Sequence, residues 1–400
     1  AEAHVNFQRD RKKLTGPEPT DTTDPIVNPS TLDHRKSSQV CGACHVAHVR
    51  VDPSGKFTNY IPGTDYDEAR RPLRMSEEYM NRHLGLADAT NKTELREAFM
   101  KDALSHFWPD GTPRIASNEY NGLLASACYT KGQMSCISCH SMHQSGTDKR
   151  APKQWANDQL QASKLGDQAC LQCHDAKDYR STEHTHHPLS SSGSTCYNCH
   201  MPHSTYALLN AVRSHTVNSP TVDVSDKAER PNACNLCHLD RTLEWTSKHL
   251  ADWYDQALPQ LTEEQREVAA GPLWILKGNA GLRALMAWHI GWQPAREAAV
   301  NDWSGPYLAV LMDDNYPALR IVASRTMQKL PLYRHIAYDF LADQKTRRPA
   351  ILQVMAAWKK QHAGDSHDPT LLVNLNDKQQ SQNFRSLLNA RDNRPIYMSE

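Results

Sequence analysis

Cys196-Tyr197-Asn198-Cys199-His200 is one of five copies of a single pentapeptide pattern in this sequence of 400 residues. In every copy two residues separate a pair of cysteines, and a histidine follows the second cysteine directly. The other copies are Cys41-Gly-Ala-Cys44-His45, Cys136-Ile-Ser-Cys139-His140, Cys170-Leu-Gln-Cys173-His174 and Cys234-Asn-Leu-Cys237-His238. They use ten of the 11 cysteines, and no cysteine follows Cys237. The chemistry that these thiols carry is therefore confined to the N-terminal part of the chain.

This spacing is the attachment signature of c-type haem. Two thiols at positions i and i+3 project from the same side of a helical turn, where they can add to the two vinyl groups of one porphyrin. A zinc ribbon and a thioredoxin-like dithiol are the alternatives, but neither requires histidine after every second cysteine. The sequence therefore predicts five covalently bound haem c groups. Their proximal iron ligands are the motif histidines His45, His140, His174, His200 and His238.

Each iron also needs a second axial ligand, and the chain has 21 histidines. His48, His143 and His203 each lie three residues after a motif histidine, on the same face of a helix that continues the motif. Such neighbours cannot bind one iron from opposite sides, so each is a candidate ligand of a neighbouring haem. A surface position or a contact to a haem propionate is the alternative. Further candidates at loop-closing distance from a motif are His34, His215 and, from the run His184-Thr185-His186-His187, His187.

The composition describes a chain with little apolar material for a core. Only 39% of the residues are apolar, and the mean hydropathy is −0.69. Residues 1–243 contain many Pro, Ser, Thr, Asn and Asp residues, and such a chain buries too little apolar surface to offset its ordering entropy. Five flat, apolar haems would supply the missing interior. We expect residues 1–243 to form a mainly α, haem-cored domain of short helices and long loops, unstructured without haem.

The charge balance excludes several classes of protein. Lys and Arg together number 45, as do Asp and Glu, so the formal net charge is zero. This excludes a strongly basic nucleic-acid binder and an acidic solvating tail. No apolar run approaches the roughly 18 residues that a membrane-spanning helix needs. Haem propionates would make the loaded protein acidic although the chain is neutral.

Residues 244–400 differ in character, because cysteine is absent and apolar residues recur at helical spacing. Asn279-Ala280-Gly281-Leu282-Arg283 and Asn315-Tyr316-Pro317-Ala318-Leu319-Arg320 resemble two copies of one helix start, and Leu282 and Leu319 lie 37 residues apart. Arg348-Pro349-Ala350-Ile351-Leu352 is a candidate third copy. The interval is near the roughly 40-residue period of HEAT repeats, which stack helix pairs around a concave face. The alternative is an irregular all-helical domain.

Cys128 is the one cysteine outside the motifs. Haem attachment takes place outside the cytoplasm, where an unpaired thiol is unusual. A buried small apolar residue is one interpretation, and an axial or substrate-side thiol at an open-faced haem is another. An intermolecular disulfide is a third. Tyr120 and Tyr129 are candidate proton donors in the same pocket, so all three residues are candidate catalytic groups.

The motifs also carry a family resemblance. Cys196-Tyr-Asn-Cys-His-Met201-Pro202-His203, followed by Arg213-Ser214-His215, resembles multihaem cytochromes related to the ammonia-forming nitrite reductases and octahaem reductases. Phe107-Trp108-Pro109-Asp110-Gly111, Glu119-Tyr120-Asn121-Gly122 and the stretch Arg230–His238 resemble a narrower bacterial family. Its members are multihaem cytochromes with a HEAT-type or tetratricopeptide-type C-terminus. The resemblance spans nearly the whole chain and implies a cytochrome domain followed by a helical-repeat domain.

Two departures limit what the resemblance implies. The Cys-x-x-Cys-Lys motif of the catalytic haem in nitrite reductases is absent from the sequence, so that activity is not inherited. The chain starts Ala1-Glu2-Ala3-His4, whereas proteins like this one often have a further Cys-x-x-Cys-His-Gly-Pro-Gly just upstream. We therefore expect a sequence that is either processed or incomplete, and His4 is a further candidate distal ligand.

Three functions are compatible with these features. The first is an electron carrier that passes single electrons between redox partner proteins through five His/His-ligated haems. The second is a reductase or dehydrogenase acting on a small nitrogen or sulfur compound at one open-faced haem. The third is a subunit of an extracellular cytochrome filament, in which further cytochromes or copies of the chain are the partners. The carrier is the favoured interpretation, and each requires a periplasmic or extracellular location.

Overall fold

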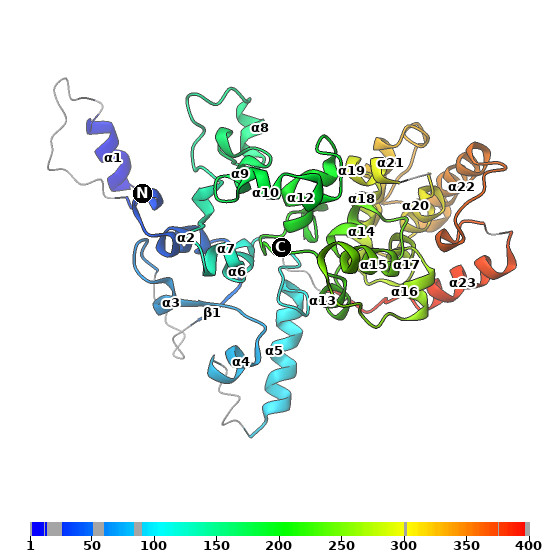
Figure 1. Ribbon diagram of the computed structural model, residues 1–400, viewed down its shortest axis with the longest axis horizontal. Coiled ribbons are helices and arrows are strands. Elements are labelled where there is room, and N and C mark those ends of the chain that lie inside the picture. Colours follow the sequence, from blue (N-terminus) through cyan, green and yellow to red (C-terminus); the bar gives the residue numbers. More distant parts are fainter. Residues whose placement is uncertain are drawn as a thin grey trace.

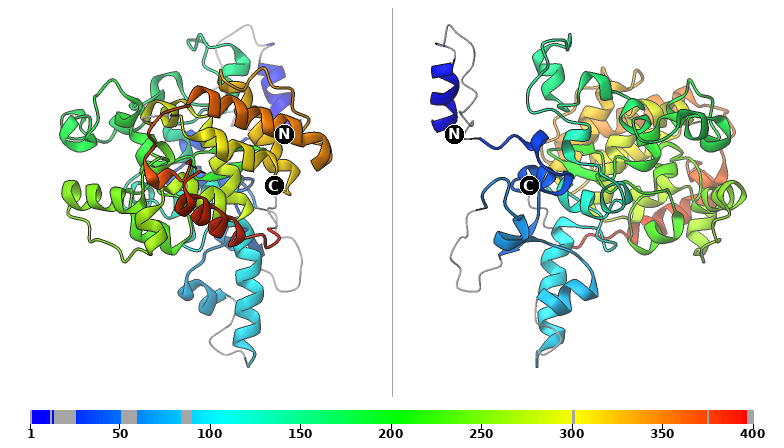
Figure 2. Two further views of the ribbon diagram at one scale, coloured as in Figure 1. Left: turned by 90° about the vertical axis from the view of Figure 1, so that its right-hand side faces the viewer. Right: turned by 60° about the vertical axis from the view of Figure 1, so that its left-hand side comes forward.

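The computed structural model describes residues 2–11, 13, 26–50, 60–83, 90–299, 302–374 and 376–396. Within these ranges the chain is mainly α-helical, which confirms the predicted class. Figure 1 shows the N-terminal segments on the left and the C-terminal helices packed together on the right. The helix α1 (Glu2–Arg11) lies apart from the rest, and α5 (Lys92–His106) projects from the N-terminal half in all three views of Figures 1 and 2.

Short helices connected by loops make up the rest of the N-terminal half. They are α2 (His34–Gly42), α3 (Tyr66–Ala69), α4 (Glu77–His83), α6 (Glu119–Leu124), α7 (Ala127–Thr130), α8 (Pro152–Ala156), α9 (Gln168–Leu171), α10 (Ala176–Tyr179), α11 (Thr182–Thr185), α12 (Cys196–His200), α13 (Val222–Lys227) and α14 (Ala233–Cys237). The 3₁₀ turns are η1 (Pro29–Thr31), η2 (Cys136–Ser138), η3 (Ala162–Lys164) and η4 (Ser192–Ser194).

Local capping explains why these helices start and stop where they do. The Asp33 side chain accepts hydrogen bonds from the backbone N–H groups of Arg35 and Lys36 at the start of α2. Ser181 accepts from the His184 N–H at the start of α11, and that helix ends at His186, whose φ of 50° is left-handed. Polar residues thus delimit one- and two-turn helices, as the sequence predicts.

Sheet is confined to two small hairpin-like pairs among the described residues. β1 (His48–Arg50) pairs antiparallel with β2 (Arg70–Pro72), and β3 (Thr205–Ala207) with β4 (Asn210–Val212). Leu208 and Leu209 connect β3 to β4 with positive φ angles of 43° and 65°, as a tight two-residue hairpin turn requires. This hairpin lies against the C-terminal helices and contributes Tyr206 to their core.

The C-terminal half consists of longer packed helices, drawn in yellow-green to red in Figure 2. They are α15 (Leu243–Tyr254), α16 (Glu263–Glu267), α17 (Ala270–Lys277), α18 (Ala280–Ile290), α19 (Gln293–Ala298), α20 (Ser304–Met312), α21 (Pro317–Lys329), α22 (Gln344–Gln361), α23 (Lys378–Asn389) and the 3₁₀ turn η5 (Pro369–Leu371). α17 packs on α18 and α20 on α21, and the second pair stacks on the first through α18 and α21.

The two repeated helix starts are α18 and α21, which occupy equivalent places in the stacked pairs. The third copy expected at Arg348 differs from them. α22 begins at Gln344 behind the cap Asp343, contains Pro349, and packs on α20, the first helix of its pair. It therefore occupies the place of a first helix, while α18 and α21 are second helices. Pro349 lies inside α22, where it removes an i→i−4 hydrogen bond, whereas Pro317 is the first residue of α21, where no such bond is lost.

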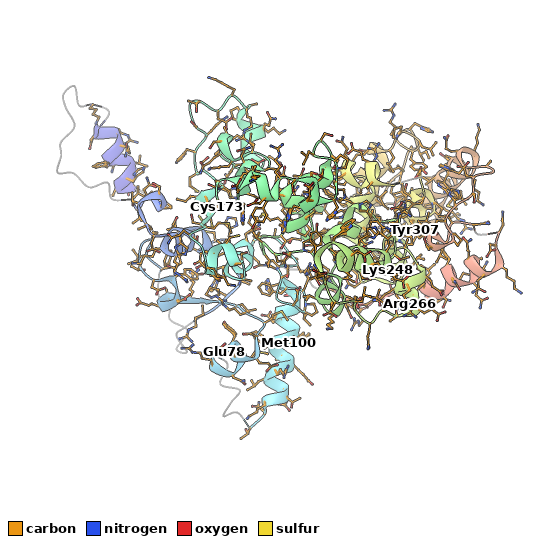
Figure 3. The ribbon with its side chains drawn as sticks, in the orientation of Figure 1. Glu78, Met100, Cys173, Lys248, Arg266 and Tyr307 are labelled. Carbon is orange, nitrogen blue, oxygen red and sulfur yellow. The ribbon has the colours of Figure 1, made fainter. Side chains whose placement is uncertain are left out.

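The largest buried apolar cluster includes residues from before and after position 243. The domain boundary expected at this position therefore stays a prediction. Trp108, Tyr206 and Leu236 pack in the same buried cluster as Leu276 and Met286. Buried within this body, Arg283 donates through Nε to Asp314 Oδ2 at 2.8 Å. Figure 3 shows Tyr307 among these packed helices and Cys173 in the other half.

The N-terminal half has only small apolar clusters of its own among the described residues. One consists of Ala47, Leu73, Ala103 and Phe107, and another centres on Tyr120 and Tyr129. All 11 cysteines are half-buried or exposed, although free cysteine is usually among the most buried residue types. None of the described helices is long and apolar enough to cross a membrane.

Candidate functional site

Each Cys-x-x-Cys-His motif forms one helical turn. In four motifs the backbone N–H of the histidine donates to the carbonyl of the first cysteine, at 2.9–3.1 Å. These pairs are His45 to Cys41, His140 to Cys136, His174 to Cys170 and His238 to Cys234. The fifth motif, Cys196–His200, lies entirely within α12. The turn therefore places both thiols and the imidazole of each motif close together, as the spacing predicts.

The first motif is held by α6, which is more than 70 residues away in sequence. His45 Nδ1 lies 2.8 Å from Glu119 Oε2, and the Tyr120 N–H donates to the His45 carbonyl at 2.9 Å. The Asn121 side chain exchanges two hydrogen bonds with the backbone of Ala47. The hydrogen bond that His45 donates to the Glu119 carboxylate raises the pKa of His45. Gly42 is necessary here because a Cβ would lie 2.5 Å from the Tyr120 ring.

The second motif histidine faces His215. The rings of His140 and His215 are nearly parallel, with centroids 6.2 Å apart and an interplanar angle of 26°. His140 Nδ1 donates to the Asp158 carbonyl at 2.9 Å, and His215 Nδ1 to the Arg213 carbonyl at 3.2 Å. A carbonyl oxygen only accepts, so both Nδ1 atoms carry the proton and both Nε2 atoms have a lone pair free.

The helix α11 and the loop after it provide partners for two further motifs. His184 is stacked with His200 at a centroid distance of 6.1 Å and an angle of 9°, and His187 faces His238 at 6.0 Å and 31°. His186 lies between them in sequence, but its left-handed backbone turns its ring onto Trp253, at 4.2 Å. The rings of these three neighbouring histidines thus face three different partners: His200, Trp253 and His238.

The separation in these three pairs fits a metal ion held between two imidazoles. With metal–nitrogen bonds of about 2 Å and each ring atom about 1 Å from its centroid, trans imidazoles have centroids about 6 Å apart. Burial keeps the imidazoles in the neutral, ligating form: it lowers the pKa of His184 and His215, and that of His238 to about 4. The half-exposed thiols beside them would be covered by a covalently bound porphyrin.

Consecutive motifs are neighbours in space. The Cys136 thiol forms a hydrogen bond with Cys41 that lowers the pKa of Cys41, and Cys196 does the same for Cys170. These contacts join the first motif to the second and the third to the fourth.

The two remaining steps are joined by direct contacts. The Gln172 side chain of the third motif donates to the Ser138 carbonyl of the second motif at 3.1 Å. The helix α14 packs on α12, which joins the fifth motif to the fourth. Burial raises the pKa of Cys139, and that of Cys234 to about 12. In Figure 1, α2, α9, α12 and α14 follow one another from left to right.

The remaining distal candidates occupy different environments. His34 begins α2, its ring contacts Tyr129 edge-on at 5.3 Å, and its Nε2 is buried without a hydrogen-bond partner. His203 packs against Trp288 and Trp292, and burial lowers its pKa to about 2.

Three other distal candidates lie elsewhere. His143 is exposed, His48 begins β1, and His4 lies on α1. Among the described residues, His45 and His174 do not belong to a stacked imidazole pair.

Cys128 borders the third motif, although only eight residues separate it from Cys136 in sequence. Burial chiefly raises the pKa of the Cys128 thiol, and the charges of Cys170 and Cys173 raise it further. Tyr120 and Tyr129 form a hydrogen bond with each other, and burial raises the pKa of both phenols. Cys128 is half-buried, and its role stays a prediction.

Sequence reasoning missed three residues of the site. His184 belongs to the run from which only His187 was selected, and Glu119 was quoted only for its family resemblance. Gly193 was overlooked, yet a Cβ at this position would lie 2.2 Å from Cδ2 of His187. The density of histidines in the run was a signal for more than one ligand, but no local signal indicated Glu119 or Gly193.

No protein-family model matches the chain, and searches of curated proteins and of solved structures found no similar protein.

Proposed function

We propose that this chain is a multihaem c-type cytochrome that carries electrons through five haems, one on each Cys-x-x-Cys-His motif. His45, His140, His174, His200 and His238 are the proximal ligands in this proposal. His215, His184 and His187 are the second axial ligands of the irons bound by His140, His200 and His238. This assignment is supported by the three stacked imidazole pairs.

The observation that carries the proposal is the spatial order of the motifs. Packing of α2 on η2 connects the first motif to the second, and packing of α12 on α14 connects the fourth to the fifth. Hydrogen bonds from Gln172 to the Ser138 carbonyl and from the Cys196 N–H to Asp167 connect the second to the third and the third to the fourth. Bound haem would supply reversible one-electron exchange between Fe(III) and Fe(II). The chain supports it by holding successive attachment sites side by side, which suits a linear route for electrons.

The imidazole pairs favour a carrier over a reductase at three of the sites. Two opposed imidazoles occupy both axial positions of a metal held between them, and no position is left for a substrate. Backbone carbonyls hold Nδ1 of His140, His200, His215 and His187. This fixes the orientation of each ring whatever the oxidation state, so little reorganisation accompanies electron transfer.

The partners and the location follow from the same chemistry. A chain of six-coordinate haems needs a one-electron donor protein and a one-electron acceptor protein. Covalent haem attachment requires thiols kept available outside the cytoplasm, so we propose a periplasmic or extracellular location. The stacked helix pairs of the C-terminal half provide a helical-repeat-like surface on which such partners could dock.

Haem content and mass test the core of the proposal. The alkaline pyridine spectrum should report five haems per chain, and the intact mass should equal the polypeptide plus five haems. A mass equal to the bare polypeptide would overturn it. So would titratable thiols at the motifs, or disulfides between Cys41 and Cys136 and between Cys170 and Cys196.

The assignment of His184 and His187 as iron ligands has a matched control in His186, which lies between them in sequence. His184→Ala and His187→Ala should each turn one haem in five high-spin in the ferric electron paramagnetic resonance spectrum, because each removes an axial imidazole. His186→Ala should not, since that ring packs on Trp253 instead. In a chain that lacks the fourth attachment site (Cys196→Ala with Cys199→Ala), His184→Ala should add no further high-spin signal. An added signal there would contradict the pairing of His184 with His200.

A further inference from the structure

A second cluster of metal-ligating side chains lies in the C-terminal half, which contains none of the Cys-x-x-Cys-His motifs. His362 follows the last turn of α22, and Gly364, with a φ of +92°, turns the chain back on itself. The turn brings the Asp365 carboxylate to 2.8 Å from His362 Nδ1. His367 lies two residues further on, and its ring centroid is 5.8 Å from that of His362. One ligand atom from each of the three residues lies within 4.8 Å of the others.

Unpartnered nitrogens show that this cluster is not a finished hydrogen-bond network. His362 Nε2 and both ring nitrogens of His367 are buried without a hydrogen-bond partner. The His362 side chain is only 11% exposed. Buried polar atoms left unpaired cost about 1–3 kcal/mol each in protein hydrogen-bond series. One unpaired nitrogen from each of two neighbouring imidazoles therefore indicates a missing electron-pair acceptor, such as a metal ion.

Asp302 borders the cluster from the segment before α20. Its Oδ1 accepts from the hydroxyl and the N–H of Ser304, while its Oδ2 accepts from the Tyr333 hydroxyl at 3.4 Å and lies 3.8 Å from His362 Nε2. Trp358 forms one wall: its Nε1 donates to the Asp302 carbonyl, and its ring lies 5.4 Å from both imidazoles. Gly305 packs directly on that ring, because a Cβ there would lie 2.5 Å from it.

We infer that His362, His367 and Asp365, completed by Asp302, bind one divalent transition-metal ion of the zinc class. Two imidazole nitrogens and two carboxylate oxygens are a common tetrahedral donor set for zinc. Ligands on one such ion, at bonds of about 2 Å, lie about 3.3 Å apart. Asp365 accepts from Nδ1 of His362, so the ion would bind this imidazole through Nε2, and the Asp365 side chain, which is 51% exposed, would turn away from Nδ1 to reach it. The ion would tie the segment after α22 to the segment before α20.

Zinc content in the haem-loaded full-length chain tests this inference. After dialysis against Zn²⁺ and then against buffer, elemental analysis should find about one more zinc per chain than in the His362→Gln/His367→Gln double variant. Asp365→Asn, a same-shape change at an exposed position, should weaken zinc binding more than about tenfold. His335→Gln removes an exposed histidine of the same half and should bind zinc as the wild type does.

Thermal unfolding gives a second readout. Zn²⁺ should raise the unfolding midpoint of the wild type and of His335→Gln, but not that of Asp365→Asn, because a ligand stabilises only the state that binds it. Mg²⁺ should have no effect on any of them, since it prefers oxygen ligands. Equal zinc content in the wild type and Asp365→Asn would overturn the inference. Iron measured in the same samples reports on the haems separately, so either proposal can fail alone.

Discussion

At the scale of single residues, the motif histidines differ in what holds their Nδ1 atoms. His140 and His200 donate to backbone carbonyls, whereas His45 pairs with the carboxylate of Glu119. Burial raises the pKa of Glu119, but the hydrogen bond from His45, a backbone hydrogen bond and the charges of His215 and His45 together outweigh burial and lower the carboxyl pKa overall. A carboxylate partner makes an imidazole a stronger electron donor and so favours the ferric state of a bound iron.

Glu119→Gln should therefore raise the reduction potential of the first haem. Glutamine keeps the shape and can still accept from Nδ1, so only the charge is lost. A tenfold change in the ferric–ferrous preference corresponds to about 59 mV for one electron, and we expect a positive shift of that order in a spectroelectrochemical titration. Glu97→Gln, at an exposed position on α5, is the matched control. Five unchanged potentials would show that Glu119 does not tune an iron.

The absence of a side chain at Gly193 leaves the space that the His187 ring occupies. An added methyl group at Gly193 would lie 2.2 Å from the His187 ring, whereas Gly146 has no atom within 4 Å of such a methyl group. Gly193→Ala should displace His187 and convert one haem to the high-spin state, and Gly146→Ala should leave the spectrum unchanged. Identical ferric spectra of the two variants would argue against the pairing of His187 with His238.

At the scale of elements, α6 connects distant parts of the N-terminal half. Asn121 bridges the backbone of Ala47 and Leu73, and Gly122 packs against the backbone next to His215, where a Cβ would lie 3.0 Å from the His215 carbonyl carbon. One short helix thus positions the first motif and the partner of the second. Its stability comes from these contacts, since six residues are too few for a helix in isolation.

Asn121→Ala should destabilise this half of the protein. It removes three buried hydrogen bonds and leaves backbone groups of Ala47 and Leu73 unpaired. A cost of about 3 kcal/mol is expected from such losses, measured as a lower denaturant midpoint followed through haem absorbance. Asn91→Ala at the start of α5 removes a side chain without a cap hydrogen bond and should change the midpoint little. Equal midpoints for the two variants would contradict the role of α6.

At the scale of the whole molecule, the two halves are stabilised differently. The C-terminal helices share a large apolar core around residues such as Leu285 and Tyr307, whereas the N-terminal half has only small clusters. Haem would supply most of the interior of the N-terminal half, while the C-terminal half has its own. Loss of haem should therefore affect the two halves unequally.

A chain expressed without haem attachment should lose structure between α2 and α12 but keep its C-terminal helices. Limited proteolysis with mass spectrometry should find early cleavage in residues 26–200 and protection from α15 onward. The haem-loaded chain, treated in parallel, should resist cleavage in both halves. Equal resistance of both halves in the haem-free chain would mean that the N-terminal half folds on its own side chains.

Local patterns were enough to predict much of this protein. The turn at each Cys-x-x-Cys-His motif depends on hydrogen bonds within five residues, and the helix starts at Ala280 and Pro317 depend on caps and apolar spacing nearby. Short-range interactions of this kind are written directly in neighbouring residues, so the thiol and imidazole sets and the helical class could be predicted before any fold was known.

The pairing of histidines was settled only in three dimensions. His184 and His187 are three residues apart, yet they face different motifs because the backbone at His186 turns between them. Glu119 reaches His45 across 74 residues, and α22 packs on α20 although its proline resembles that of α21. Contacts between distant segments depend on how every intervening loop returns, and no residue pattern near either partner encodes that path.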